Sequence, residues 1–503
     1  MNRREFLIGS SLTALNAALV DVALAQMIDP WTDGFARARA ADPYMVGLAS
    51  VDAEMPLSAK VSFEGKLPSG LRGTLYRNGP ALHEFAGLRY HHWFDGDGMV
   101  QAFRFDEDGL AHTGRLVLTD KLASEIKAGK RLRAAFGTSL PGIESPTDND
   151  SLNVANTNIL PVAGEVLALW EGGSAFSVDP DTLATRGAKV WRADLKGVPF
   201  SAHPKVDRDA VWNFGLDTFS STIVFYEIGH DGQIRRAEVL QMPGITRVHD
   251  FVVTERHLVF LLPPMRFSQD KFRAGESFLA CHEWMDGAPL RVMTVEKSDL
   301  RTYRLFELPS GFVFHLGNAW EDEAGVIRFD YVRAPDASLL TVAFTEIMRG
   351  NKVDIEPGQS SHVVLDTRTG KTTQTLVQGS AEFPRVDPRR IGIRNRQLYH
   401  TTQIQRPQGI PGFDGIRRLD VETGAVDQYS FGFDFLVEEH VVVPNRADDR
   451  EGAGFLIGTV LDLNRACTQV SVFDAMNLVA GPLASARLPY ALPLGLHGSF
   501  VAA

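Results

Sequence analysis

The sequence predicts an all-β protein, a seven-bladed β-propeller with a cap of helices and loops, and three observations support this fold class. After residue 40, short runs rich in Val, Ile, Phe, Leu and Tyr alternate with turn residues, as strands and hairpins do. No long stretch in that part of the sequence has the apolar period of a helix. Turn signatures, in which an acidic residue is followed closely by a small or turn-forming one, recur along the chain.

The turn signatures set the number of blades that we expect. They begin at Asp106, Asp179, Asp231, Glu323, Asp366, Asp420 and Asp474. The last three are 54 residues apart, and a unit of several strands repeated every 40–50 residues or so is typical of a propeller. Seven turns therefore predict seven blades, and the larger gaps before Asp179 and Glu323 predict insertions. A sandwich of unrelated hairpins is the alternative that the pattern leaves open.

The two insertions are candidates for the cap. Residues 121–147 carry five cations beside apolar residues, and residues 261–280 carry Met265 and several phenylalanines. Loops of this length in a compact domain are usually functional or disordered. A mixed basic and apolar segment such as 121–147 either contacts a membrane surface or forms a solvated surface helix. Its cations are Lys121, Lys127, Lys130, Arg131 and Arg133.

The N-terminus has the pattern of an export signal. Arg3 and Arg4 are followed by an uncharged run and then by Ala23-Leu24-Ala25, an Ala-x-Ala cleavage site. The paired arginines resemble a twin-arginine signal. We therefore expect residues 1–25 to be the signal, residues 26–503 to form a single propeller domain, and the protein to be periplasmic. The alternative is an uncleaved amphipathic helix. No later run reaches the roughly 20 apolar residues of a membrane span, so the mature chain is expected to be soluble or peripheral.

Composition excludes one class of partner. The 503 residues carry a net charge of -11, whereas nucleic-acid binding requires a basic face. The two cysteines, Cys281 and Cys467, lie far apart in the sequence. We interpret them as buried free thiols rather than as a disulfide.

Four of the 14 histidines share a setting, because each borders a strand-like apolar run: His203, His249, His315 and His497. Taken singly, each is more often a structural histidine. Their spacing puts them on different predicted blades, and the inner strands of a propeller surround one central channel. One histidine per blade can therefore meet at a single metal ion. The adjacent His91 and His92 would point to opposite faces of a strand, so we interpret them as structural.

Eight stretches resemble the carotenoid cleavage oxygenase family in that family's own order. They are Gly73–Pro80, Tyr90–Met99, Asn156–Asn158, Leu167–Glu171, Val248–Phe251, His315 with Asn318-Ala319, Glu382–Val386 and Gly495–Gly498. The resemblance covers essentially the whole chain after the signal. It implies a seven-bladed propeller with a helical and loop cap, and a ferrous ion, Fe(II), on its axis.

The resemblance also assigns roles to residues. It implies that His203, His249, His315 and His497 bind the iron. Glu171, Glu382 and Glu439 match the glutamates that hold three of the imidazoles, and Thr157 matches a position beside an open coordination site. A metal-bound histidine usually donates its other N–H to such an acceptor. Glu438 is the neighbouring alternative to Glu439, since the family's Glu-Pro is replaced here by Glu439-His440.

The implied reaction is the oxidative cleavage of a carbon–carbon double bond by O2 into two carbonyl products. The substrate would be an apolar polyene in a tunnel, with Phe267, Phe272 and Phe278 as one wall or as core residues. One branch of the family cleaves carotenoids or apocarotenoids, and another cleaves phenolic stilbenes such as lignostilbene. The stilbene branch carries a lysine where this chain has Trp170. Because tryptophan offers a phenolate mainly an apolar face, we predict a carotenoid-type substrate. A metal-free propeller that serves as a binding scaffold is the alternative from another class.

Overall fold

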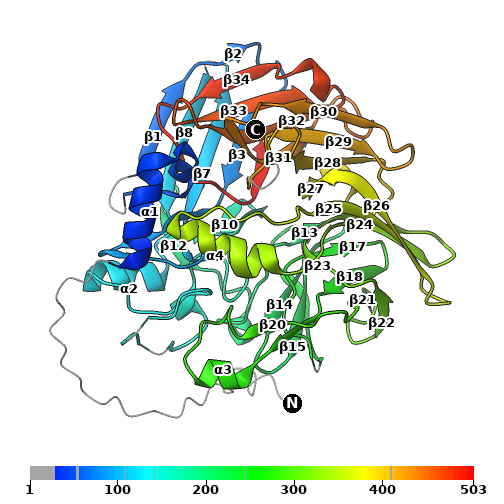
Figure 1. The fold of residues 1–503 in the computed structure, drawn as a ribbon. Coiled ribbons are helices and arrows are strands. Elements are labelled where there is room, and N and C mark those ends of the chain that lie inside the picture. Colours follow the sequence, from blue (N-terminus) through cyan, green and yellow to red (C-terminus); the bar gives the residue numbers. More distant parts are fainter. Residues whose placement is uncertain are drawn as a thin grey trace.

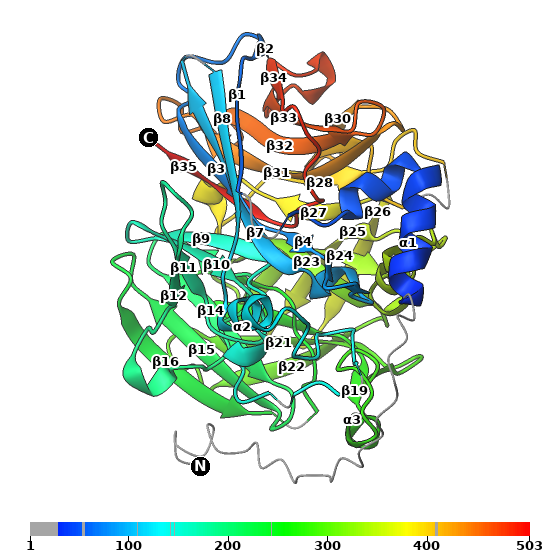
Figure 2. The same cartoon turned by 90° about the vertical axis from the view of Figure 1, so that its left-hand side faces the viewer.

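The computed structural model describes residues 29–503 except 53–55, 108, 141, 145, 243 and 408–410. The predicted signal, residues 1–25, therefore lies outside the described residues. Seven antiparallel sheets are arranged around one axis, in the order of the sequence (Figures 1 and 2). This arrangement confirms the predicted seven-bladed propeller.

Each blade has four strands, and the first and last blades each gain one more. Blade 1 contains β1 (Leu57–Val61), β3 (Gly73–Arg77), β7 (Asp97–Asp106), β8 (Gly109–Leu116) and β35 (Gly498–Ala502). Blade 2 contains β9 (Asn158–Val162), β10 (Glu165–Leu169), β11 (Phe176–Val178) and β12 (Thr185–Ala188). Blade 3 contains β13 (Lys205–Val206), β14 (Val211–Asp217), β15 (Thr222–Ile228) and β16 (Ile234–Gln241). Blade 4 contains β17 (Phe251–Val253), β18 (His257–Leu262), β21 (Leu290–Glu296) and β22 (Tyr303–Leu308).

The remaining blades follow the same plan. Blade 5 contains β23 (Phe312–Glu321), β24 (Val326–Ala334), β25 (Gln359–Asp366) and β26 (Thr372–Ser380). Blade 6 contains β27 (Glu382–Arg385), β28 (Gln397–Thr402), β29 (Gly415–Asp420) and β30 (Val426–Ser430). Blade 7 contains β31 (Phe435–Pro444), β32 (Gly454–Asp462), β33 (Cys467–Asp474), β34 (Ala484–Arg487) and the N-terminal β2 (Glu64–Gly65). Short pairs complete the strands: β4 (Pro80–Leu82) on β7, β5 (Glu84–Phe85) with β6 (Leu88–Arg89), and β19 (Met265–Phe267) with β20 (His282–Trp284).

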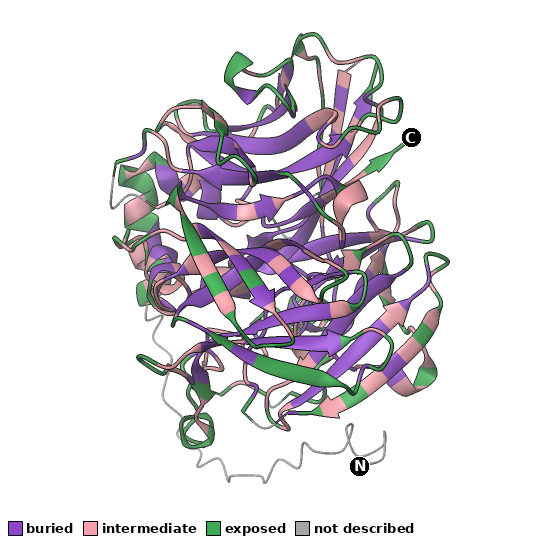
Figure 3. Cartoon of the chain, turned by 90° about the vertical axis from the view of Figure 1, so that its right-hand side faces the viewer, coloured by how far each residue is buried: buried purple, intermediate pink, exposed green. Residues whose placement is uncertain are grey.

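Burial increases toward the axis. All three residues of β17, a strand at the inner edge of its sheet, are buried, whereas four of the six residues of the outer strand β22 are exposed. Figure 3 shows the same trend, with exposed residues on outer strands and loops. Facing blades share apolar clusters, such as the one that joins Leu75 and Phe103 of blade 1 to Ile457 and Val470 of blade 7. Each such side chain contributes about 1.5–3 kcal/mol when fully buried.

The ring closes through both ends of the chain. The C-terminal strand β35 pairs along its whole length with β3, and the N-terminal β2 pairs with β34 of the last blade. The blue and red ends of the sequence consequently lie side by side in Figure 1. Each end of the chain thus adds a strand to the blade built by the other end, so backbone hydrogen bonds link the first and last blades.

One part of the turn prediction was wrong. Six of the seven signatures do mark the outermost hairpin of a blade, from Asp106 between β7 and β8 to Asp474 between β33 and β34. Glu323, however, lies between β23 and β24, in the same blade as Asp366. The outer hairpin of blade 4 lies instead between β21 and β22, where Asp299 accepts hydrogen bonds from Arg301 and Thr302. In that turn Asp299 is followed by Leu300 and Arg301 rather than by a small or turn-forming residue, so the signature missed it.

Helices and irregular segments cover one face of the ring. The α-helices are α1 (Pro30–Ala41), α2 (Asp120–Ala128), α3 (Gln269–Arg273) and α4 (Phe344–Glu346). Shorter helical turns are η1 (Pro43–Leu48), η2 (Trp93–Asp95), η3 (Asp150–Leu152), η4 (Ala193–Leu195), η5 (Leu339–Ala343), η6 (Ile347–Arg349), η7 (Pro388–Arg390) and η8 (Leu478–Ala480). Phe35 of α1 and Met348 of η6 pack together with Leu436 and Leu461 of blade 7. No helix among the described residues is long and apolar enough to cross a membrane.

The two insertions differ from each other in how they pack. Residues 261–280 form β19 and α3, between the second and third strands of blade 4. In residues 121–147, Lys121 and Arg131 are buried and form ion pairs with Asp97 and Glu125. We expected this segment to contact a membrane surface or to form a solvated helix; for Lys121 and Arg131 both expectations were wrong, whereas Lys127 and Lys130 are exposed. Cys281 and Cys467 are both free and buried, as predicted.

Candidate metal centre

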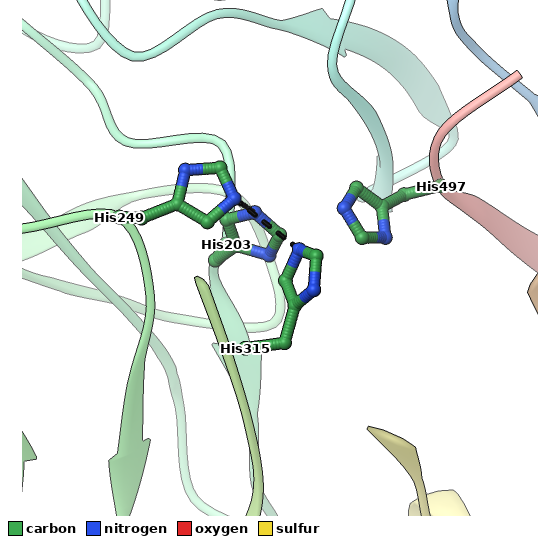
Figure 4. Close-up of side chains that lie close together, drawn as sticks. All are labelled: His203, His249, His315 and His497. Carbon is green, nitrogen blue, oxygen red and sulfur yellow. Dashed lines mark hydrogen bonds between the residues drawn. The ribbon is translucent and has the colours of Figure 1, made fainter. Parts of the chain in front are cut away.

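The structure brings the four predicted histidines together on the axis. Their candidate ligand nitrogens all lie within 4.8 Å of one another, and all four side chains are buried. Figure 4 shows the rings converging from separate segments of the chain. The Nε2 atom of His249 lies 3.0 Å from that of His203 and 3.2 Å from that of His315. The described residues contain no other such group of His, Cys, Asp or Glu side chains.

Local strand geometry directs these rings inward. His497 comes directly before the inner strand β35, His203 and His249 each lie two residues before the inner strands β13 and β17, and His315 lies within β23. The register of β23 shifts on both sides of Leu316, the residue after His315. Similar shifts occur in β27, after Glu382, and in β31, at Glu439. Bulges of this kind redirect side chains and are common beside functional sites.

Three glutamates hold three of the imidazoles from behind. Glu171 accepts a hydrogen bond from Nδ1 of His249, and Oε2 of Glu382 lies 2.5 Å from Nδ1 of His315. Oε1 of Glu439 lies 2.8 Å from Nδ1 of His497. An imidazole that donates from Nδ1 presents the lone pair of Nε2 to the centre. The three carboxylates thus fix the tautomer that a metal requires.

The geometry distinguishes Glu439 from its neighbour. Glu438 contacts no histidine of the centre; its carboxylate accepts hydrogen bonds from Thr459 and from the backbone N–H of Gly495. Both glutamates are buried, although neighbours on a regular strand point to opposite faces. The bulge between Val437 and His440 allows both to turn inward.

The fourth imidazole, His203, makes no such hydrogen bond to a carboxylate of the described residues, and sequence reasoning missed the acidic residue beside it. The nearest carboxylate to Nδ1 of His203 is Asp250, at 3.9 Å. Asp250 is itself held by Lys205 at 2.7 Å and by the backbone N–H of Leu316 at 2.8 Å. The available signal was the position of Asp250, directly after His249 in one of the stretches that resemble the family.

Burial favours the neutral, metal-binding form of two of the four imidazoles. Burial lowers the pKa of His203 well below its ordinary value and that of His497 to about 4. Burial also lowers the pKa of His315, but Glu382 more than offsets this and the net shift is upward. The pKa of Glu439 is lowered, because Arg385 and His497 outweigh the effect of burial. Neutral imidazoles beside ionised carboxylates are what metal binding requires.

These residues fit a divalent transition metal. Imidazole nitrogen suits iron, zinc, copper and nickel. Two nitrogens at right angles around a metal at about 2.1 Å would be about 3.0 Å apart, which agrees with the shorter Nε2 separation. Four imidazole ligands would leave a six-coordinate ion with two positions for other ligands.

A cavity of about 1730 Å³ reaches the centre from the capped face. His249, His315, His497 and Thr157 contribute to its wall. The hydroxyl of Thr157 donates to Oδ1 of Asn156, at 3.0 Å. His203 borders instead a small polar chamber of about 30 Å³, which it shares with His315 and His497. The histidines therefore separate a large cavity from a space for about one or two waters.

Aromatic side chains line much of the large cavity. Phe272 and Phe278 of the blade 4 insertion are in its wall, as are Phe94, Phe314 and Phe383. Phe267 is not in the wall; its ring packs behind, 5.4 Å from that of Phe278. Of the three phenylalanines predicted there, two line the cavity and one supports them.

Comparisons with known proteins agree with this architecture. A family profile described as "Retinal pigment epithelial membrane protein" (RPE65) matches residues 48–502. The chain belongs to the RPE65 and carotenoid cleavage oxygenase family. Among its relatives, the apocarotenoid-15,15'-oxygenase of Synechocystis is 31% identical, over 87% of this chain and 92% of the relative. The lignostilbene-alpha,beta-dioxygenase isozyme III of Sphingomonas paucimobilis is 30% identical, over 87% and 92%.

Solved structures of the family match the fold. The crystal structure of a cobalt-substituted apocarotenoid oxygenase from Synechocystis has a TM-score of 0.83 and 29% identity, and the match covers 92% of this chain and 98% of the other. The match confirms the fold, and that relative carries cobalt in place of another metal. Two other predictions can be located: His91 stacks on Trp31, and His92 lies 2.9 Å from the carbonyl of Leu340. Neither belongs to the histidine cluster.

Proposed function

We propose that this protein is a non-haem iron(II) dioxygenase that cleaves a carbon–carbon double bond of a carotenoid or apocarotenoid. The observation that carries the proposal is the set of four clustered imidazoles, three of which line the end of a large aromatic cavity. The relatives add support, since one is named an apocarotenoid-15,15'-oxygenase and others carotenoid 9,10(9',10')-cleavage dioxygenases. In the reaction, an alkene and O2 give two carbonyl products, each of which retains one oxygen atom.

Iron(II) is the metal that we propose for His203, His249, His315 and His497. Four neutral imidazoles add no negative charge, so a bound cation keeps its full charge and open positions for small molecules. Bound there, iron supplies the redox chemistry with dioxygen that amino-acid side chains lack. Glu171, Glu382 and Glu439 would act by orienting three of the rings.

The protein's own part in the reaction is to position the substrate and to exclude water. The proposed roles require no side chain to exchange a proton with the substrate, because both oxygen atoms of O2 end in the products. The walls of the cavity hold the double bond at a fixed place beside the centre, which lowers the entropic barrier. Thr157 lies in the wall shared with the histidines, so we propose that it limits access beside an open position.

Cavity size and one side chain favour a polyene over a phenolic stilbene. About 1730 Å³ exceeds the usual range for a drug-sized ligand, roughly 300–1,000 Å³. Trp170 lies in the wall beside Glu171 and offers an apolar face rather than a cation. A phenolic stilbene, the substrate class suggested by the name of the lignostilbene relative, is the second candidate.

Iron analysis and product analysis test the proposal together. The purified protein should contain about one iron atom per chain and should convert an apocarotenal into two shorter carbonyl compounds, identified by mass spectrometry. Cleavage of a hydroxystilbene alone would reverse the choice of substrate. A protein with no iron that turns over neither compound would be a binding scaffold rather than an enzyme.

We also propose that the cavity mouth contacts a membrane surface. Phe219 is 51% exposed and packs against Phe272, a residue of the cavity wall that is 38% exposed. Exposed aromatic side chains favour the interface between lipid and water. Binding to lipid vesicles should therefore weaken when both phenylalanines are replaced by serine; equal sedimentation with vesicles before and after the change would contradict the proposal.

We further propose that the protein is exported to the periplasm by the signal in residues 1–25. The support is the order of its charged, apolar and Ala-x-Ala regions. Replacing Arg3 and Arg4 by lysine should retain the protein in the cytoplasm of a bacterial host, as cell fractionation would reveal. Unchanged export would exclude a twin-arginine route.

A further inference from the structure

Arg247 is a buried cation in the wall of the large cavity, and no described residue forms a hydrogen bond or ion pair with it. Its side chain lies two residues before His249, and the residue is 7% exposed. Among the described residues it makes no hydrogen bond and no ion pair, and its Nε atom is enclosed without a partner. Its two terminal nitrogens are not enclosed in this way. The other buried arginines each donate at least one hydrogen bond: Arg77, Arg89, Arg131, Arg406 and Arg417.

The neighbours of Arg247 do not neutralise it. The guanidinium lies 5.3 Å from the centre of the Phe136 ring, a contact too weak to replace hydrogen bonds. His282 is engaged by backbone carbonyls, 2.9 Å from that of Phe278 and 3.3 Å from that of Thr246. Glu171 influences Arg247 electrostatically but forms no ion pair with it, and its carboxylate accepts a hydrogen bond from His249.

The backbone that carries Arg247 is held in place. The hydroxyl of Thr246 donates to the carbonyl of Met265 at 2.8 Å, and its own carbonyl accepts from Thr218 at 2.9 Å. A fixed guanidinium needs little reorganisation when a ligand arrives. Burying an unpaired cation is unfavourable, whereas a guanidinium forms two parallel hydrogen bonds to a carboxylate. The site is thus complementary to an anionic oxygen group on the ligand.

We propose that Arg247 determines specificity by binding the oxygenated end of the substrate, and that it favours a carboxylate end over an alcohol. The preferred substrate class is then an apocarotenoic acid, a polyene with one carboxylate end. This inference deepens the proposed function and rests on it for the polyene part of the substrate. Arg247 is a binding residue here and takes no part in the reaction itself.

The position of Arg247 has a consequence for the products. Residues two apart on an extended chain have Cα atoms about 7 Å apart, so the anchored end would lie close to the centre. The position of the cleaved double bond is then set by its distance from the carboxylate end. Substrates that differ in length at their far end should all yield the same short fragment that carries the carboxylate.

Ligand binding tests the proposal without relying on turnover. Iron-loaded protein, kept free of oxygen, is titrated with an apocarotenoic acid and with the alcohol of the same chain, and quenching of tryptophan fluorescence is measured. The acid should bind roughly 10- to 100-fold more tightly, as expected for a hydrogen-bonded charge pair. Arg247→Gln should reduce its affinity to that of the alcohol and leave the alcohol unchanged. Arg247→Lys should give an intermediate affinity, because lysine keeps the positive charge but cannot form the two parallel hydrogen bonds of a guanidinium.

Arg266→Gln is the matched control, since Arg266 lies in the neighbouring insertion and pairs with Glu283 on the surface. It should bind both ligands as the wild type does. Equal affinity of the wild type for acid and alcohol, or an acid preference that survives in Arg247→Gln, would overturn the assignment. Failure of the proposed function looks different: the acid would bind through Arg247, but admission of oxygen would yield no carbonyl products.

Discussion

At the scale of single residues, the centre depends on which atom of each imidazole faces inward. A histidine ring can bind through either nitrogen, and the carboxylate behind it makes the choice. Glu439 makes this contact with His497, and the adjacent Glu438 does not. Both are acidic and buried, so residue type alone does not separate them.

Variants of Glu439 and Glu438 test whether the contact to His497 matters for metal binding. We expect Glu439→Gln to weaken iron binding about 10- to 100-fold. A neutral amide oxygen accepts the hydrogen bond from Nδ1 of His497 more weakly than a carboxylate does, so the ring is held less firmly. Competition with a graded chelator measures the affinity. The matched change Glu438→Gln should leave the affinity close to that of the wild type. Equal losses in both variants would mean that general disruption of β31, and not the contact to His497, is responsible.

At the scale of elements, the cap is anchored by two buried cations, Lys121 and Arg131, which the sequence placed in a segment expected at the surface. Lys121 at the start of α2 is fully buried and lies 2.9 Å from Asp97 and 3.1 Å from Glu125. Arg131, beyond the end of the helix, contacts the same two carboxylates. The two cations and two anions balance each other, and the segment is fixed to β7 through Asp97.

Removing one of these charges should be costly. Lys121→Met leaves two buried carboxylates with a single cation, and breaking a buried pair in this way typically costs about 3–5 kcal/mol of unfolding free energy. Urea denaturation of the variant measures the loss. Lys127→Met on the exposed side of the same helix should change the stability by no more than about 0.5 kcal/mol. A wild-type unfolding curve for Lys121→Met would show that the cap is not held by this network.

At the scale of the whole molecule, the metal site and the closure of the ring meet at the C-terminus. His497 belongs to the centre, and the next five residues form β35, which closes blade 1. Gly498 and Ser499, next to His497, pair with the C-terminal end of β3. Val501 and Ala502 pair with its N-terminal end, farther along the strand from His497.

Shortening the chain should separate the two roles. Deleting residues 497–503 removes a ligand and the closing strand, so we expect loss of both iron and fold stability. Deleting only residues 501–503 should fray the end of β35 and leave the iron content nearly unchanged. His497→Ala keeps the strand, and its expected result is a folded ring with little iron. Elemental analysis and thermal unfolding report the two properties, and a fully iron-loaded 497–503 deletion would show that the four-histidine centre is wrong.

The metal should also stabilise the ring, because its four histidines come from four blades. A ligand at 100 times its dissociation constant adds about 2.7 kcal/mol to the free energy of unfolding. Treatment with a chelator should therefore lower the unfolding temperature, and iron(II) should restore it. If the thermal unfolding curves with and without metal were identical, the metal would bind too weakly to link the blades.

The sequence by itself determined the class of fold and the identity of the key residues. Alternating strand-like runs and recurrent turns predicted seven blades because strand period and turn chemistry are local properties. The order of the motifs pointed to His203, His249, His315 and His497 together with the three glutamates. The turns were only partly correct: Glu323 was counted as a blade, and the turn near Asp299 was missed, since a turn signature does not say where in a sheet its hairpin lies.

Only the tertiary structure decided how distant residues combine. The bulge in β31 turns Glu439, and not Glu438, toward His497. The fold also brings Lys121 and Arg131 into ion pairs with Asp97, which lies more than 20 residues earlier in the sequence. No local pattern shows that Arg247 is buried without a hydrogen-bonding partner among the described residues. The physical reason is the same in each case. Whether a charged side chain is solvated, paired or poised for a ligand depends on what the folded ring packs against it, and a propeller brings together residues from all around the chain.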